Sequence, residues 1–200
     1  GVFVSYRNDR NEEADIYRGT RLLMHQPYSA RLYPLDGVSF HGKVCYNREA
    51  SMDRMERPDG QELRLTEDAG NILWIRPCVG MTYPQAGPQV RAVLHDSYHS
   101  GTIAVNAGLE EFAGRMEQAG IPVYLTGASS GEAEYETVRM YEQYGIRVLP
   151  KMSLIAAYCK LWLALSNDLD VNSIMNTCIA EDIIQEQRGV IRTDEQSRRD

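Results

Sequence analysis

Four short runs of mainly apolar residues dominate the part of this 200-residue chain that follows residue 70. They occupy 71–76, 90–95, 121–126 and 146–149. Consecutive, rather than alternating, apolar residues are typical of strands that are buried on both faces of a parallel sheet. The runs therefore predict a small, mostly parallel β-sheet whose faces are covered by helices.

Helical patterns separate and follow these runs. Apolar residues that recur every three or four positions predict helices at 105–119, 132–144, 153–165 and 171–184. Gly120 and Gly145 follow the first two helices as C-terminal stops, and Ser153 stands where an N-cap is expected. Strands that alternate with helices in this way predict an α/β fold.

The first 70 residues of the chain are less regular. Residues 1–6 form a strand-like segment rich in β-branched and aromatic residues, and a polar turn separates them from a second strand expected at 16–21. Because a strand pattern begins at the first residue, we expect the chain to start in the middle of a fold. The expected organisation has four parts, namely the last strand and hairpin of an N-terminal α/β domain (1–48), a linker (49–70), a C-terminal α/β domain (71–186) and a flexible tail (187–200).

The amino-acid composition of the chain argues against several classes of binding partner. The formal net charge of −7 argues against a nucleic-acid partner, because phosphate binding needs a basic surface. No run approaches the roughly 18 to 20 apolar residues of a membrane helix, so no membrane partner is expected. The four cysteines are widely spaced without a Cys-x-x-Cys pair, which argues against a metal site and favours free thiols in a reducing cytoplasm. We expect no metal and no organic cofactor.

The loop after the second apolar run, 96–102, is the densest group of functional side chains. Its candidate ligand-binding residues are Tyr98, His99, Ser100 and Thr102, with Gly101 allowing close approach of the backbone. Hydroxyls and main-chain amides at the start of the next helix suit a carboxylate ligand. The alternative is that Ser100 and Thr102 only cap that helix.

A hydrolase triad in this loop is a weaker alternative. Ser97 or Ser100 with His95 or His99 and Asp96 has the required residue types. Triad members must converge in space, however, and residues this close in one loop rarely do so. The chain also lacks a Gly-x-Ser-x-Gly elbow.

The loop after the third run, 126–134, is the second candidate. Its candidate residues are Ser129, Ser130, Glu132 and Glu134. A glutamate here is suited to neutralising an ammonium group, whereas the alternative is a capped helix with acidic residues in its first turn. Since ligands of parallel sheets bind at the carboxyl ends of the strands, at a topological switch point, we expect both loops to line one cleft.

Taken in order, these segments resemble the second half of the bacterial L-asparaginase family, in particular its cytoplasmic type I branch. The match rests on Gly-Val-Phe-Val-Ser-Tyr at 1–6 with Tyr-Arg-Gly-Thr-Arg at 17–21, and on Ile-Arg-Pro-Cys-Val-Gly-Met-Thr at 75–82. It continues through Tyr-His-Ser-Gly-Thr at 98–102, Gly-Ile-Pro-Val at 120–123, and the Met-Ser, Ala-Ala, Lys-Leu and Leu-Ser pairs between 152 and 166. The resemblance covers nearly the whole chain to about residue 186.

The resemblance implies that catalysis and ligand binding belong to different domains. The family hydrolyses L-asparagine to L-aspartate and ammonia with threonines, an Asp and a Lys of its N-terminal domain, and the motifs Thr-Gly-Gly-Thr and Thr-Asp-Thr that carry them are missing here. No catalytic residue is therefore expected in this chain. It would supply homodimer or homotetramer contacts and a pocket for an asparagine-like amino acid, in which Glu132 or Glu134 binds the ammonium and Ser100 or Thr102 the carboxylate.

Two positions depart from the family pattern. Thr102 best matches the position where the family loop carries an asparagine, and Gly127 or Ala128 stands where the family carries a glutamine-like residue. A non-enzymatic amino-acid sensor or interaction module on the same domain is the second hypothesis. A third is the amidotransferase subunit that shares this fold and acts on charged transfer RNA, which the acidic charge does not support.

Overall fold

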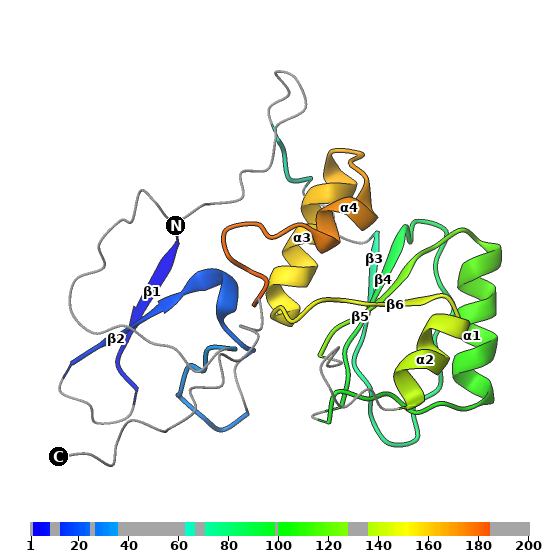
Figure 1. The fold of residues 1–200 in the computed structure, drawn as a ribbon, viewed down its shortest axis with the longest axis horizontal. Helices are drawn as coiled ribbons and strands as arrows, with labels where there is room; N and C mark the ends of the chain where they lie inside the picture. The colour runs from blue at the N-terminus through cyan, green and yellow to red at the C-terminus, as the bar shows by residue number, and fades with distance from the viewer. Residues whose placement is uncertain are drawn as a thin grey trace, which may run out of the picture.

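The computed structural model describes residues 2–8, 13–24, 27–35, 63–66, 71–98, 100–127 and 136–184. Within them the chain forms two sheets, one of two strands and one of four strands (Figure 1). In chain order the elements are β1 (Phe3–Tyr6), β2 (Asp15–Arg18), a 3-10 helix η1 (Gly19–Arg21), β3 (Ile72–Ile75), β4 (Ala92–His95), α1 (Ala107–Gln118), β5 (Val123–Leu125), α2 (Glu136–Gln143), β6 (Ile146–Val148), α3 (Leu154–Ser166) and α4 (Val171–Asn176).

The four apolar runs are the four strands of one fully parallel sheet. Its order is β3-β4-β5-β6, and its register pairs Trp74 with Leu94, Leu94 with Tyr124, and Tyr124 with Arg147. All four residues of β4 and all three of β5 are buried, as expected for central strands covered on both faces. The predicted α/β class with a parallel sheet is confirmed.

Helices cover both faces of this sheet (Figure 1). On one face α1 and α2 pack through residues such as Phe112 and Tyr141 onto Val93 and Leu125. On the other face α3 packs onto strand residues that alternate with those. The alternation follows from the two-residue period of a strand, which sends neighbouring side chains to opposite layers.

The first two strands form a separate antiparallel pair. Its register runs from Phe3 opposite Arg18 to Tyr6 opposite Asp15, and the Arg18 guanidinium lies 5.3 Å from the centre of the Phe3 ring. The strand expected at 16–21 ends earlier, because Gly19–Arg21 turns into a 3-10 helix. We call β1, β2 and η1 together the N-terminal hairpin.

Two predicted helix boundaries are wrong. The helix expected from 105 begins at Ala107, because the side chain of Asn106 accepts a hydrogen bond from Leu109 N and caps it. The helix expected at 171–184 ends at Asn176. The carbonyl oxygens of Met175 and Thr177 accept hydrogen bonds from the ammonium group of Lys160, a buried lysine on α3, and the helix does not continue. Of the helix predicted at 132–144, the residues before 136 lie outside the described part.

The expected topological switch point is absent from the described sheet. Its strands stand in chain order, and the connection from β3 to β4 crosses the same face as α1, with Met81, Tyr83 and Ala86 packed there. A switch point requires two neighbouring connections that leave on opposite faces. A binding site at this edge must therefore be formed by the loops themselves.

Candidate functional site

The carboxyl ends of β4 and β5 bring the two predicted loops together. Asp96 and Ser97 directly follow β4, and Thr126 and Gly127 directly follow β5. A Cβ atom added to Gly127 would overlap the Ser97 hydroxyl oxygen, so the first residues of both loops are in contact. The two loops therefore leave from one edge of the sheet, as the sequence predicts.

Asp96 is the charged centre of this edge. Its side chain is 25 % exposed, and partial burial raises its pKa, while the Ser97 N–H, Arg76 and the Thr126 hydroxyl lower it. Ser97 N donates to Asp96 Oδ1 at 2.9 Å, whereas Arg76 Nε stays 3.8 Å from Oδ2 and is largely exposed. The carboxylate is positioned, incompletely neutralised and able to accept an ammonium group.

A tyrosine–histidine pair lies beside Asp96. His95 Nδ1 faces the Asp96 carbonyl oxygen, which only accepts hydrogen bonds, so Nδ1 carries the proton. His95 Nε2 then accepts from the Tyr83 hydroxyl at 3.1 Å. The Tyr83 ring stacks on Phe112 at 4.8 Å, and burial raises the pKa of Tyr83 to about 12. Both groups are neutral near pH 7 and hold each other in place.

Tyr83 also lines a small cavity of about 130 Å³, together with Tyr98. Its other walls come from the loop after β3 and from the segment that leads into α1, namely Pro77, Cys78, Gly80, Met81, Ile103, Ala104 and Asn106. Roughly 30 Å³ is the volume of one liquid water molecule, so the space suits only a small group such as the head of an amino acid. Of the predicted site residues, Tyr98 is the one placed in this wall.

Ser100 and Thr102 lie in a tight turn. Tyr98 N donates to Thr102 O, and Gly101 N donates to Tyr98 O. The two side-chain hydroxyl oxygens are 2.9 Å apart and share a hydrogen bond. The expectation that they begin or cap the next helix is wrong, because Asn106 holds the cap position. Both remain near the edge as exposed or partly exposed hydroxyls.

The remaining predicted site residues, His99, Ser129, Ser130, Glu132 and Glu134, lie outside the described residues. The triad alternative that uses His95 has no geometry to support it, because both of its ring nitrogens are engaged by Tyr83 and a carbonyl. In the part that the structure describes, no three His, Cys, Asp or Glu side chains gather to hold a metal ion. No helix there is long and apolar enough to cross a membrane.

Sequence reasoning did not place Asp96, Thr126 and Arg76 together, although the structure does. A usable signal existed, because each is the first residue after one of three neighbouring parallel strands, and such positions meet at the same edge. Tyr83 carried no such signal. It belongs to a loop without a repeating pattern and reaches His95 only through tertiary packing.

A larger groove of about 740 Å³ lies at the opposite, amino edge of the sheet. Glu117, Glu142 and Asp170 line it, together with Arg147, whose guanidinium is held by the Tyr124 hydroxyl and Asn172. Its charged groups lie on open surface. The carboxyl edge is the better candidate, because a partly buried carboxylate and a buried hydroxyl interact there and a small cavity lies at the same edge.

A scan against protein-family models and a search of curated proteins both found no match for this chain.

The contact between the two loops predicts a glycine requirement at position 127. Gly127→Ala is expected to lower the free energy of unfolding by about 1 to 2 kcal/mol, because φ is +75° and the new Cβ would overlap Ser97 Oγ. Gly114→Ala is the matched control. Gly114 lies inside α1 with open space at its Cβ, and the substitution is expected to raise stability by about 0.5 to 1 kcal/mol. Urea denaturation of both variants measures this, and equal effects would contradict the close approach.

Burial of His95 predicts a pH dependence of stability. Burial lowers the pKa of His95 from 6.5, and the bond to the Asp96 carbonyl opposes the shift only in part. As the pH falls through 6.5, the unfolded chain takes up a proton that the folded chain resists, so stability falls by up to about 1.4 kcal/mol per pH unit. His95→Gln keeps an acceptor for Tyr83 and does not titrate. Its unfolding free energy should vary less between pH 7.5 and 5.5 than that of the unmodified protein, and identical slopes would refute the assignment.

Proposed function

We propose that the carboxyl edge of the parallel sheet binds a small amino acid, asparagine or a close analogue, and that the chain is the C-terminal portion of an asparaginase-like amidohydrolase. Such an enzyme hydrolyses L-asparagine to L-aspartate and ammonia, with its catalytic threonines outside this chain. The observation that carries the proposal is the interaction of Asp96 with Thr126, which follow neighbouring strands, at the same edge of the sheet as the cavity that Tyr98 lines.

The chemistry of an amino acid matches this edge. Its ammonium group needs a carboxylate, which Asp96 offers with Glu132 or Glu134 as further candidates. Its carboxylate needs donors, and the Arg76 guanidinium and the hydroxyls of Ser100 and Thr102 are available there. The fixed Tyr83–His95 pair keeps one wall rigid, which limits the conformational entropy lost on binding.

The resemblance to the asparaginase family extends the proposal beyond the binding site. It places the nucleophilic threonines in a separate domain, assigns this chain a role in homodimer or homotetramer contacts, and requires no metal or organic cofactor. By the same resemblance to the type I branch we propose a cytoplasmic location.

Calorimetry with L-asparagine tests the site. The unmodified chain is expected to bind saturably, and Asp96→Asn is expected to weaken binding about tenfold to a hundredfold, because a charge-assisted hydrogen bond is lost. Asp168→Asn is the control, since this carboxylate is 83 % exposed and pairs with Arg91 on the surface. Unchanged affinity in Asp96→Asn, or no binding by the unmodified chain, would disprove the proposed site.

An ammonia-release assay on the same preparation tests where catalysis lies. The chain alone is expected to release no ammonia from L-asparagine, and robust turnover would contradict the placement of the threonines elsewhere. The non-enzymatic amino-acid sensor is the second candidate, because the same binding edge would serve it without any catalytic residue. The residues encoded immediately upstream of Gly1 separate the two, since the enzyme requires threonine-rich loops there.

A further inference from the structure

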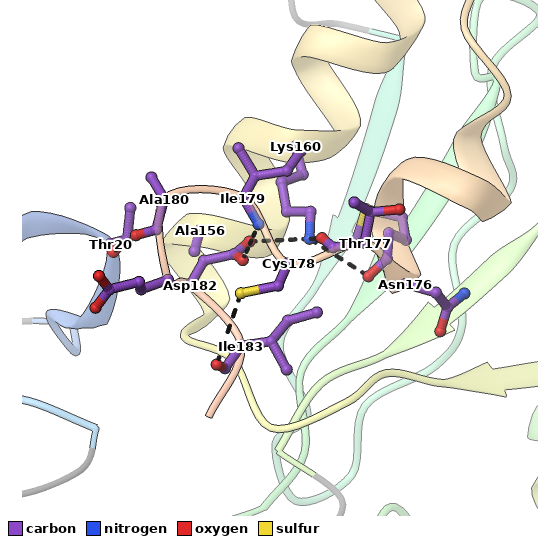
Figure 2. A network of polar contacts seen from close by, with 12 residues as sticks. Thr20, Ala156, Lys160, Asn176, Thr177, Cys178, Ile179, Ala180, Asp182 and Ile183 are labelled. Atoms are coloured by element: carbon purple, nitrogen blue, oxygen red, sulfur yellow. Dashed lines mark hydrogen bonds and ion pairs between the residues drawn. The ribbon is translucent and has the colours of Figure 1, made fainter. Parts of the chain in front are cut away.

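The segment 177–184 runs between the N-terminal hairpin and the helices that cover the sheet (Figures 1 and 2). We call it the strap. It contains no helix or strand, although an amphipathic helix was expected there. Its shape depends on contacts with three separate parts of the molecule, which are α3, the hairpin and the loop after β6.

A buried ion pair ties the strap to α3. Lys160 and Asp182 are only 5 % and 2 % exposed, and Lys160 Nζ lies 2.9 Å from Asp182 Oδ2 (Figure 2). In the described part of the chain, the ion pair with Lys160 is the polar contact of Asp182 Oδ2, and it neutralises this carboxylate. Lys160 Nζ also donates to Thr177 O at 2.6 Å and to Met175 O at 3.5 Å. One ammonium group thus fixes both ends of the turn that follows α4.

The carboxylate of Asp182 shapes the middle of the strap. Its Oδ1 accepts from Ile179 N at 2.7 Å, and Asp182 N donates to Ile179 O at 3.1 Å. Between these residues Ala180 and Glu181 have φ of 51° and 59°. Side chains other than glycine rarely adopt this left-handed conformation, and it persists only where surrounding contacts impose it. Asp182, held by Lys160, imposes it here.

The left-handed turn places two carbonyl oxygens of the strap in contact with the hairpin. Ala180 O accepts from the Thr20 hydroxyl at 3.0 Å, and Glu181 O accepts from Arg21 Nε at 2.8 Å. The Glu181 carboxylate pairs with Arg18 at 2.8 Å. Both accepting carbonyls belong to the residues with positive φ, so these hydrogen bonds require the turn to keep its conformation.

The last contact reaches the candidate site's edge of the sheet. Ile184 N donates to Lys151 O at 2.8 Å, and Lys151 lies in the loop that follows β6 at the carboxyl edge. The strap therefore joins the hairpin, α3 and the loop after β6 through a single short segment.

We infer that the strap is a latch that holds the N-terminal hairpin on the parallel-sheet unit, and that the Lys160–Asp182 ion pair keeps it closed. Loss of either charge leaves the other buried without a counter-charge, which costs far more than loss of an exposed pair. Opening of the turn relieves that penalty by exposing the remaining charge to water. The hairpin then loses its strap contacts, and an isolated two-stranded hairpin is marginally stable at best.

Hydrogen exchange of backbone amides in Lys160→Met and Asp182→Asn tests the latch. The amides of Asp182 and Ile184 report on the strap, and that of Gly19, which donates to Val2 O, reports on the hairpin. These three are expected to exchange roughly a hundredfold faster in both variants. The amide of Val93, in the centre of the sheet, is expected to keep its protection. Lys151→Met is the matched control, because this lysine is exposed and, among the described residues, meets the strap through its backbone oxygen.

Two results would overturn the inference. In one, the strap and hairpin amides of the variants stay as protected as in the unmodified protein. In the other, Val93 is deprotected by the same factor as Asp182, which would make the ion pair a general support of the fold. If Lys160→Met does not fold, Asp182→Asn decides, because asparagine keeps the acceptor for Ile179 N while removing the charge.

Discussion

Phe112→Ala is expected to lower the free energy of unfolding by about 3 to 5 kcal/mol. Phe112 is fully buried on α1, and its ring stacks on Tyr83 at 4.8 Å. Removal of the ring leaves a cavity at the centre of the layer between α1 and the sheet. It also frees Tyr83, whose hydroxyl is the partner of His95, so the wall of the candidate site loses its support.

Chemical denaturation followed by circular dichroism measures this loss. Val79→Ala is the control, since Val79 is 97 % exposed and its truncation is expected to change stability by no more than about 0.5 kcal/mol. Asparagine affinity should fall in Phe112→Ala under conditions where the variant is still folded. A stability loss of less than about 1 kcal/mol would contradict the packing described for this layer.

Tyr141→Phe is expected to cost about 2 to 4 kcal/mol, although it removes a single oxygen atom. The Tyr141 hydroxyl accepts from Ile103 N at 2.9 Å and donates to Ile103 O at 3.0 Å, and both residues are buried. Phenylalanine fills the same space and leaves a buried backbone donor and a buried acceptor without partners. The hydroxyl thereby connects α2 to the segment that leads from the candidate site into α1.

Tyr144→Phe is the matched control for this variant. Tyr144 follows α2, is partly exposed, and has no side-chain hydrogen bond among the described residues. Its loss of a hydroxyl is expected to change stability by no more than about 0.5 kcal/mol. Equal stability losses at 141 and 144 in thermal denaturation would show that the Ile103 hydrogen bonds contribute little.

The candidate site was predictable in location but only partly in composition. The sequence places two polar loops after two neighbouring parallel strands, and the overlap that a side chain at Gly127 would make with Ser97 bears out that they share an edge. Of the residues predicted to bind a ligand, Tyr98 lies in the wall of the small cavity. Asp96 was assigned only to a triad, because nothing local distinguishes a half-buried carboxylate from a solvated one. Its environment depends on Thr126 and Arg76, which come from other strands.

The expected C-terminal helix also shows that local sequence does not reveal the environment of a buried charge. The pattern at 171–184 has the spacing of an amphipathic helix, and its first turns form as predicted; in the structure Asp170 caps them by accepting from Ser173 N. Beyond Asn176 the competing interaction is the burial of Lys160 and Asp182, which needs carbonyl oxygens and a turn in place of helical hydrogen bonds. A buried charge without a partner costs more than the few hydrogen bonds of a short helix end.

Local sequence patterns were enough to predict the fold class, because buried strands, helix stops and N-caps each depend on only a few neighbouring residues. Apolar runs became the four parallel strands, Ser153 caps α3, and Gly120 and Gly145 end α1 and α2 with positive φ. Tertiary structure alone decided the strand order without a switch point, the Tyr83–His95 pair and the strap. Each of these depends on which residues, distant in sequence, are buried together. Whether the pairing of buried polar and charged groups offsets the cost of removing them from water is decided only when the chain has packed.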